Sequence, residues 1–166
     1  KYFVHNNQVF ALTVGQPTPV TEIGYKDKTT PQGVKLMPIN PIRLMLAAGC
    51  GFVARIYSDV NQVEEVLKEA LKHKGFAFIE ILQPCLIFHP DMGYKEKTYS
   101  LQETKHDKSN FQEAMKKAEE FDYNSIHDQK NDALNARFLD DRNSQEFRHK
   151  TKIPLGIFYQ KEKPVF

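Results

Sequence analysis

Residues 51–82 decide the fold class, and they read GFVARIYSDVNQVEEVLKEALKHKGFAFIEIL. The segment Phe52–Tyr57 has the length and the β-branched and aromatic content of a strand. The segment Phe76–Leu82 is almost continuously apolar, which is typical of a strand buried on both faces of a parallel sheet. If a helix connects the two strands, they form one right-handed βαβ unit.

The connecting segment predicts that helix. Asp59 can cap its N-terminus, and Glu64 and Lys68 can pair across one helical turn. A single apolar stripe follows the helical period, formed by Val60, Val63, Val66, Leu67, Ala70 and Leu71. Gly75 can end the element. The class is therefore α/β, with a parallel sheet.

Two further elements are expected upstream of this unit. Lys1–His5 has the pattern of a short strand. Asn40 and Pro41 can supply the N-cap and the first position of a short helix over Ile42–Ala48. Gly49 can then close this helix in the left-handed conformation.

Two more elements are expected downstream. A helix should start at a Ser109 cap and run to about Phe121, with Phe111, Met115, Ala118 and Phe121 on its inner face. The segment Ile153–Tyr159 resembles a last strand. Pro154 within it favours an edge position, because proline cannot donate a hydrogen bond to a neighbouring strand.

Two stretches interrupt this alternation. Residues 15–40 are rich in Pro, Thr and Gly and are too long for an ordinary connector, so they form either a functional loop or an arm that binds a partner. Residues 123–152 are polar and charged. We expect a polar insertion there, with a helical piece around residues 132–141.

Composition limits the classes of function. A chain of 166 residues with 40% hydrophobic content suits one domain with a real core. A formal net charge of +2, with both signs interspersed, offers no broad basic face for nucleic acid. No apolar run approaches the roughly 20 residues that span a bilayer. Two cysteines are too few for a disulfide scaffold and suit a reducing cytoplasm. We therefore expect a soluble cytoplasmic protein with neither nucleic acid nor membrane as a partner.

The segment after the first strand carries the most informative side chains. Residues 5–16 read HNNQVFALTVGQ and place amides and a hydroxyl at the carboxyl end of a parallel strand, where open α/β sheets bind ligands. Asn7 offers a neutral oxygen that suits Mg²⁺, and a backbone carbonyl two residues later can point the same way. A polar turn that only closes the strand explains the same residues. Similarly, Cys85 at a strand end is either a small buried apolar residue or a ligand.

A resemblance to a known family goes further than these alternatives. Residues 7–19 read NQVFALTVGQPTP, and they resemble the motif Asn-x-(Val/Ile)-Tyr-Gly-Leu-Thr-x-Gly-Gln and the following Pro-Thr pair of 2-oxoacid:ferredoxin oxidoreductase beta subunits, of the pyruvate or 2-oxoglutarate synthase type. Further matches follow in the same order: KTTPQG at 28–33, NPI at 40–42, AAGCGFVAR at 47–55, HKGFAF at 73–78, QPC at 83–85 and IPLGIFY at 153–159. The resemblance implies that residues 1–166 are the carboxy-terminal part of one three-layer, parallel-sheet, thiamine-diphosphate-binding domain. We expect the rest of that domain upstream.

By position, the resemblance also implies site residues. Asn7 matches the side-chain ligand of the Mg²⁺ that holds the cofactor diphosphate, and Val9 matches the residue that gives this ion a backbone carbonyl. The turn around the diphosphate and the thiazolium corresponds to Phe10, Ala11, Leu12 and Thr13. Cys85 matches the fourth thiolate of a four-iron four-sulfur (4Fe-4S) cluster. The remaining metal ligand, an aspartate, and the other thiolates belong to the expected upstream sequence.

The reaction implied by the family is the oxidative decarboxylation of a 2-oxoacid to acyl-CoA and CO₂, with ferredoxin as electron acceptor. The implied partners are the alpha subunit, ferredoxin, coenzyme A and the 2-oxoacid. Because the alpha subunit supplies the carboxylate that activates the cofactor, no catalytic base is expected in this chain, and this piece alone should be inactive.

Some residues depart from the family pattern or allow another function. Val14 stands where many relatives have a lysine that meets the substrate carboxylate, which leaves the substrate open. A non-catalytic domain that keeps the fold and the subunit-binding surface without complete cofactor sites is the alternative function. Cys50 is interpreted as core packing. His5 adjoins the predicted site, whereas solvated or capping roles are expected for His73, His89, His106, His127 and His149.

Overall fold

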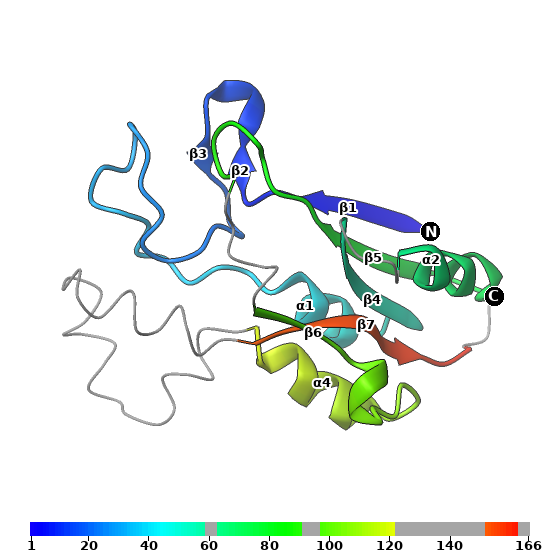
Figure 1. Ribbon diagram of the computed structural model, residues 1–166. Helices are drawn as coiled ribbons and strands as arrows, with labels where there is room; N and C mark the ends of the chain where they lie inside the picture. The colour runs from blue at the N-terminus through cyan, green and yellow to red at the C-terminus, as the bar shows by residue number, and fades with distance from the viewer. Residues whose placement is uncertain (59–62, 91–96, 122–151, 163–166) are drawn as a thin grey trace, which may run out of the picture.

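The computed structural model describes residues 1–58, 63–90, 97–121 and 152–162 (Figure 1). The strands are β1 (Tyr2–Asn6), β2 (Val9–Phe10), β3 (Gln16–Pro17), β4 (Phe52–Tyr57), β5 (Ala77–Leu82), β6 (Thr98–Ser100) and β7 (Ile153–Gln160). The α-helices are α1 (Pro41–Ala47), α2 (Val63–Lys72) and α4 (Phe111–Glu119), and short 3₁₀ turns occupy Ala11–Thr13 and Gln102–Thr104. The predicted Asp59 cap and nearly all of the predicted insertion at 123–152 lie outside the described residues.

The main sheet has five strands in the order β1-β5-β4-β7-β6. The predicted βαβ unit is confirmed, because β4 and β5 are parallel neighbours joined through α2. β1 is also parallel to β5. The described sheet is mostly parallel, as the predicted fold class requires, and the exception is that β7 runs antiparallel to β4. A strand buried on both faces is apolar in either direction, so its sequence does not reveal its direction.

β7 lies inside the sheet between β4 and β6, so the edge position predicted for this strand is wrong. Its register with β4 runs from Gln160 to Gly156, and Pro154 lies beyond that register, opposite Tyr99 of β6. Proline is compatible with this place, because the pairing with β4 has ended before it and fewer backbone donors are needed there.

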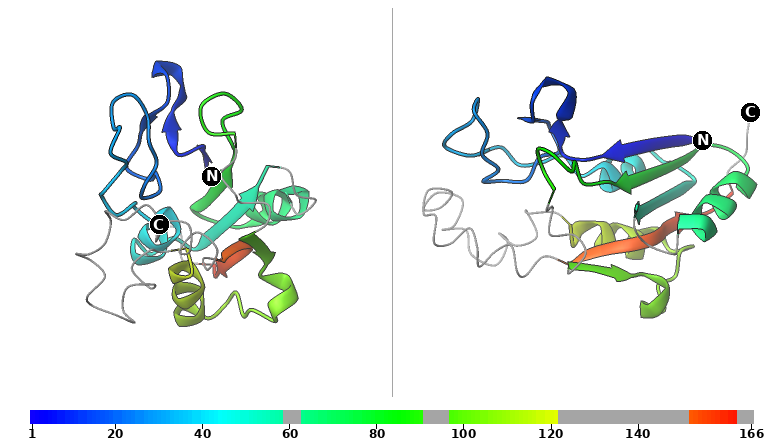
Figure 2. Two further views of the ribbon diagram at one scale, coloured as in Figure 1. Left: turned by 60° about the vertical axis from the view of Figure 1, so that its left-hand side comes forward. Right: turned by 45° about the horizontal axis from the view of Figure 1, so that its top comes forward.

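Helices cover both faces of the sheet, which confirms the three layers (Figures 1 and 2). On one face, Val53 and Phe158 pack against residues of α1 and α4: Ile42, Leu46, Ala114 and Ala118. On the other face, Ala54 and Ile56 pack against Val66 and Ala70 of α2. Successive residues of a strand point to opposite faces, so β4 contributes to both cores.

The ends of the helices follow local capping chemistry. Asn40 caps α1 by accepting a hydrogen bond from the backbone N–H of Arg43 at 3.2 Å, as expected. Gly49 has φ of +80°, which confirms the left-handed closure. The cap of α4 is Asn110 rather than Ser109, because the Asn110 oxygen accepts from the first free N–H groups of the helix. Of the predicted inner face, Ala118 and Phe121 are buried, whereas Phe111 is 41% exposed and contacts the ring of Tyr159 edge-on, at 5.7 Å between ring centres.

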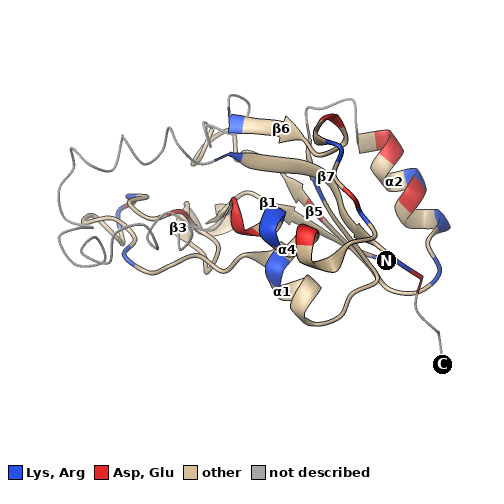
Figure 3. Ribbon diagram, turned by 90° about the horizontal axis from the view of Figure 1, so that it is seen from below, with Lys and Arg blue, Asp and Glu red and all other residues tan. Residues whose placement is uncertain are grey.

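Charged residues of both signs lie along α2 (Figure 3), where Lys68 and Glu64 form the predicted pair at 2.6 Å. Cys50 is buried, and its thiol contacts the carbonyl of Phe52 at 3.0 Å, which agrees with a packing role. Among the described residues, no helix combines the length and the apolar character needed to cross a bilayer.

Candidate functional site

The candidate site lies where β1 and β5 end. These parallel strands are in register up to the pair Asn6 and Leu82, and the backbone N–H of Gln83 donates to the Asn6 carbonyl at 2.9 Å. Three segments leave the sheet at this end, opposite the N-terminus: the β2–β3 hairpin, the loop 18–40 and the loop 83–90 (Figures 1 and 2). The sequence therefore brings the predicted residues of two separate motifs to one edge of the sheet.

Two consecutive asparagines build the turn after β1. The side-chain oxygen of Asn6 accepts from the backbone N–H of Gln8 at 3.0 Å, and that of Asn7 accepts from the N–H of Val9 at 3.1 Å. Gln8 has φ of +60°, in the left-handed region that residues other than glycine rarely adopt. Such side-chain-to-backbone bonds stabilise a tight turn. Asn7 thus lies at the carboxyl edge, where the sequence predicts it.

The remaining predicted residues form the hairpin that follows. Val9 is buried and pairs with Pro17, and Phe10 pairs with Gln16. Ala11–Thr13 forms a 3₁₀ turn, and the Thr13 hydroxyl donates to the Gln16 side chain at 2.6 Å. The turn protrudes from the protein, and Leu12 within it is 98% exposed.

Unusual backbone conformations end this turn. Val14 has φ of +78°, which is strained for a β-branched residue. Gly15 follows with φ of +91°, and a Cβ atom added there would lie 2.9 Å from the Cβ of Phe88. The hairpin therefore packs directly against the loop 83–90, and only glycine fits at the contact.

Cys85 lies in a tight turn after β5. The backbone N–H of His89 donates to the Cys85 carbonyl at 2.9 Å, which closes the turn. Hydrogen bonds from the backbone N–H groups of Phe88 and Ile87 to the sulfur lower the pKa of the Cys85 thiol below its usual range, although partial burial raises it. Cys85 is partly exposed and has no disulfide partner. A thiolate that accepts backbone hydrogen bonds is well suited to bind a soft metal.

This geometry predicts the reactivity of the two cysteines. In the protein without metal, Cys85 should react with iodoacetamide faster than Cys50, with a pH midpoint below that of a free cysteine, because the thiolate is the nucleophile. Mass spectrometry across a pH series measures both rates, and the buried Cys50 is the internal control. A Cys85 midpoint equal to that of free cysteine would contradict the stabilising role of the two N–H groups.

His89 joins the two turns. Its Nδ1 lies 3.4 Å from the Asn7 carbonyl, its Nε2 lies 3.8 Å from Glu22, and its ring lies 4.9 Å from the ring of Tyr25. The Tyr25 hydroxyl in turn donates to the carbonyl of Gly15 at 2.8 Å. Nothing in the sequence beyond the position of His89 four residues after Cys85 indicated this role.

Solvated or capping roles are expected from the sequence for His73, His89 and His106, but none of these three side chains is solvated. His89 and His73 are buried, and the imidazole of His106 is held by the carbonyl of Phe158 at 2.7 Å. Desolvation, together with the nearby Lys1, lowers the pKa of His73. His5 lies beside the candidate site, with its Nδ1 2.6 Å from the side-chain oxygen of Gln83. His127 and His149 lie outside the described residues.

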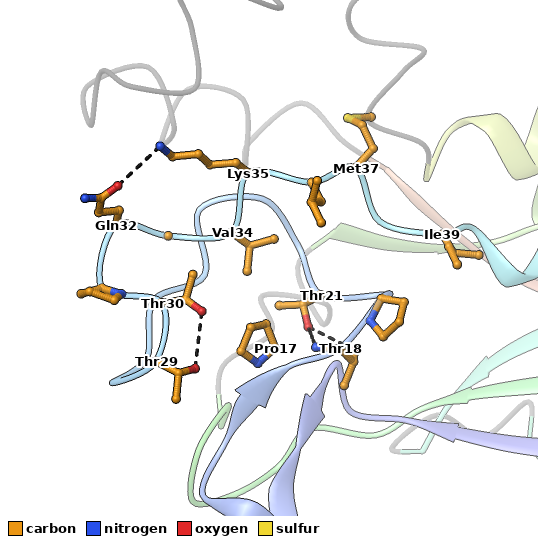
Figure 4. A pocket seen from close by; sticks show the side chains of 14 residues that line it. Pro17, Thr18, Thr21, Thr29, Thr30, Gln32, Val34, Lys35, Met37 and Ile39 are labelled. Atoms are coloured by element: carbon orange, nitrogen blue, oxygen red, sulfur yellow. Dashed lines mark hydrogen bonds between the residues drawn. The ribbon is translucent and has the colours of Figure 1, made fainter.

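The long loop 18–40 is ordered by its own hydrogen bonds. Gly24 and Val34 are joined backbone to backbone at 2.9 Å, and the Thr21 hydroxyl donates to the carbonyl of Gln8 in the site. The loop encloses an open hollow of about 900 Å³, lined by Pro17, Val34, Met37 and other residues (Figure 4). The loop is thus part of the site's framework.

The donor atoms present fit part of a magnesium site. The Asn7 oxygen keeps one lone pair beyond its bond to Val9, and an amide oxygen is a hard donor that suits Mg²⁺. The Gln8 side-chain oxygen is buried and has no hydrogen-bond partner among the described residues, although buried oxygens are normally satisfied. No group of three or more His, Cys, Asp or Glu that could hold a metal occurs in the described part of the chain. The described residues therefore offer two oxygens of the type that suits Mg²⁺, which is fewer than a complete ligand set.

Comparisons with known proteins agree with this geometry. The family "Thiamine pyrophosphate enzyme, C-terminal TPP binding domain" matches residues 1–81. The 2-oxoacid:ferredoxin oxidoreductase subunit beta of Saccharolobus solfataricus is 38% identical over 163 residues, which cover 96% of this chain and 48% of that protein. The 2-oxoglutarate oxidoreductase subunit KorB of Mycobacterium tuberculosis is 46% identical over 85 residues, covering 51% of this chain and 23% of that protein.

A solved structure is also similar. The 2-oxoglutarate:ferredoxin oxidoreductase from Magnetococcus marinus, with 2-oxoglutarate, coenzyme A and succinyl-CoA bound, superposes with a TM-score of 0.74 at 26% identity. The superposition covers 99% of this chain and 48% of that chain. The chain spans about half the length of the curated beta subunits that it matches over most of its own length. It belongs to the family of 2-oxoacid:ferredoxin oxidoreductase beta subunits and has their α/β thiamine-diphosphate-binding fold.

Proposed function

We propose that this chain is the carboxy-terminal, cofactor-binding part of a cytoplasmic enzyme that oxidatively decarboxylates a 2-oxoacid to acyl-CoA and CO₂. Thiamine diphosphate supplies the electron sink for decarboxylation. A 4Fe-4S cluster would supply the route by which electrons reach ferredoxin. The observation that carries the proposal is the meeting of the Asn7 turn and the Cys85 turn at one sheet edge, joined by His89.

The chain's own residues would position the cofactor and the metal ions. The Asn7 side chain and the Val9 carbonyl would bind Mg²⁺ against the diphosphate, and the turn from Phe10 to Thr13 would border the diphosphate and the thiazolium. Because Val9 is buried, it would keep water away from this side of the ion. Cys85, whose thiol pKa is lowered by hydrogen bonds from backbone N–H groups, would bind one iron of the cluster.

The surface around the site suits a partner subunit. Three of the most exposed large apolar side chains belong to the loops of the site: Leu12 at 98%, Leu86 at 84% and Ile87 at 79%. Neighbouring exposed apolar side chains usually mark an interface. An alpha subunit that covers these loops would bury them and would bring its own carboxylate to the cofactor.

The Asn7→Ala variant tests the proposal. In the complete enzyme, it should raise the dissociation constants of thiamine diphosphate and Mg²⁺ together, by at least about tenfold, because the lost oxygen contributes to the metal site. Isothermal titration of the cofactor at several Mg²⁺ concentrations measures both constants.

The matched control is Asn110→Ala, which removes an asparagine cap far from the site. It should cost about 1 kcal/mol of stability and leave cofactor binding unchanged. Unchanged cofactor affinity in Asn7→Ala would reject the magnesium assignment and would favour a non-catalytic domain. A separate assay of the complete enzyme identifies the substrate: 2-oxoglutarate and pyruvate are supplied in turn, and the acyl-CoA formed from each is measured.

A further inference from the structure

Three buried polar side chains cross the middle of the sheet below the site. Arg55 of β4 and Glu80 of β5 are register partners, and the Arg55 Nε donates to Glu80 Oε2 at 2.7 Å. The other oxygen of Glu80 accepts from the Asn6 side-chain amide at 2.7 Å. Arg55 and Glu80 are both 0% exposed, and Asn6 is buried too. We call Arg55, Glu80 and Asn6 the cross-strand network.

Stability alone does not explain a buried ion pair. Removing two charges from water is costly, and well-packed apolar residues in their place are often as stable or more so. The Arg55 guanidinium lies 4.1 Å from the ring centre of Phe121, which shields it further from water. A buried polar group is instead suited to fixing one conformation among several, and the network ends at the residue before Asn7.

The order of donors and acceptors determines how Asn6 is oriented. A carboxylate accepts hydrogen bonds and cannot donate them, so Glu80 must face the NH₂ group of Asn6. The Asn6 oxygen then necessarily points the other way, where it accepts from the backbone N–H of Gln8 at 3.0 Å. That bond accompanies the left-handed conformation of Gln8, with φ of +60°, which turns the chain at Asn7.

We infer that Arg55 and Glu80 are positioning residues for the cofactor: through Asn6 they hold the turn in which Asn7 presents its oxygen to the diphosphate-bound Mg²⁺. This inference rests on the proposed function of the Asn7 turn. Arg55 keeps Glu80 in place, Glu80 sets the orientation of the Asn6 amide, and Asn6 sets the conformation of Gln8.

Glu80→Gln tests the inference, because it changes one acceptor into a donor at nearly constant size. The introduced amide must turn its oxygen to the Arg55 Nε–H, since that donor has no alternative in the network. Its NH₂ group then opposes the NH₂ group of Asn6, and Asn6 has to flip. After the flip, the Asn6 NH₂ group faces the backbone N–H of Gln8, so two donors oppose each other and the turn opens.

The second single variant, Asn6→Asp, breaks the hydrogen bond between residues 6 and 80 in another way. It keeps an acceptor for the Gln8 N–H but places two carboxylates against each other, which repel. The double variant Asn6→Asp with Glu80→Gln restores the pattern, since the carboxylate accepts both from the introduced amide and from the Gln8 N–H. Rescue by a second change is not expected of residues that only fill space.

The first readout needs no cofactor. In the cofactor-free beta subunit, hydrogen exchange at the backbone amides of Gln8 and Val9 should rise at least tenfold in each single variant and return toward the parent rate in the double variant. Amides of β4 should keep their protection. Titration of the complete enzyme with thiamine diphosphate and Mg²⁺ should show a dissociation constant at least tenfold higher in each single variant, recovered in the double variant.

Ile79→Val is the matched control, because Ile79 is a fully buried neighbour of Glu80 whose truncation leaves every hydrogen bond of the network intact. If either single variant exchanges at Gln8 and Val9 like this control, the inference is overturned. If Asn7→Ala weakens the cofactor but Glu80→Gln does not, the positioning role alone fails. If exchange follows the expected pattern and no variant, Asn7→Ala included, changes cofactor affinity, the network still shapes the turn but the proposed function fails, and with it the role toward the cofactor.

Discussion

An enzyme that carries Cys85→Ser is expected to lose ferredoxin reduction while it still releases CO₂ from the 2-oxoacid. Serine has nearly the same size as cysteine, but its hydroxyl is a poor ligand for iron compared with a thiolate. The backbone N–H groups of Phe88 and Ile87 lower the pKa of the Cys85 thiol, which favours the thiolate that iron requires. Under the proposed function, decarboxylation would depend on the Asn7 turn, which this substitution leaves in place.

Three measurements separate these steps. Isotopic CO₂ release reports decarboxylation, ferredoxin reduction reports electron transfer, and electron paramagnetic resonance reports the reduced cluster. Cys50→Ala is the control, because Cys50 is buried just before β4 begins. This variant should change none of the three measurements and should cost only a little stability. A Cys85→Ser enzyme that keeps its cluster signal and reduces ferredoxin at the parent rate would show that Cys85 is not a ligand.

Local patterns were sufficient to predict the part of the fold that carries the site. The elements β4, α2 and β5 follow one another in sequence and pair as neighbours, so periodicity and connection rules place them. β7 comes from far along the chain, and its direction depends on contacts that no local pattern contains. The helix start at Asn110 differs from the predicted Ser109 because adjacent residues with the same capping chemistry compete.

The site could be predicted only in part for a similar reason. Asn7 and Cys85 belong to motifs, so their positions could be expected from the sequence. Arg55 and Glu80 were missed because a single charge in an apolar strand gives no local sign of its partner. A usable signal existed, since FVARIY and FAFIEIL each carry one charge, of opposite sign, within strands predicted to be adjacent and buried.

Arg55→Met is expected to lower the free energy of unfolding by about 3–5 kcal/mol, because it leaves the carboxylate of Glu80 buried without its cation. The double variant Arg55→Met with Glu80→Leu should regain most of this loss, since both charges are then gone and the apolar side chains fill a similar volume. Denaturant unfolding of the beta subunit measures both. Lys68→Ala is the control for an exposed ion pair and should cost less than about 1 kcal/mol.

The double variant also separates stability from function. If the network served only to hold the sheet together, a stable apolar replacement would bind the cofactor as the parent does. We expect the opposite: a subunit of near-parent stability in which the Asn6 amide has lost the partner that orients it. Its cofactor affinity should fall like that of Glu80→Gln, and parent-like affinity in this stable variant would show that the Asn7 turn forms without any buried charge beneath it.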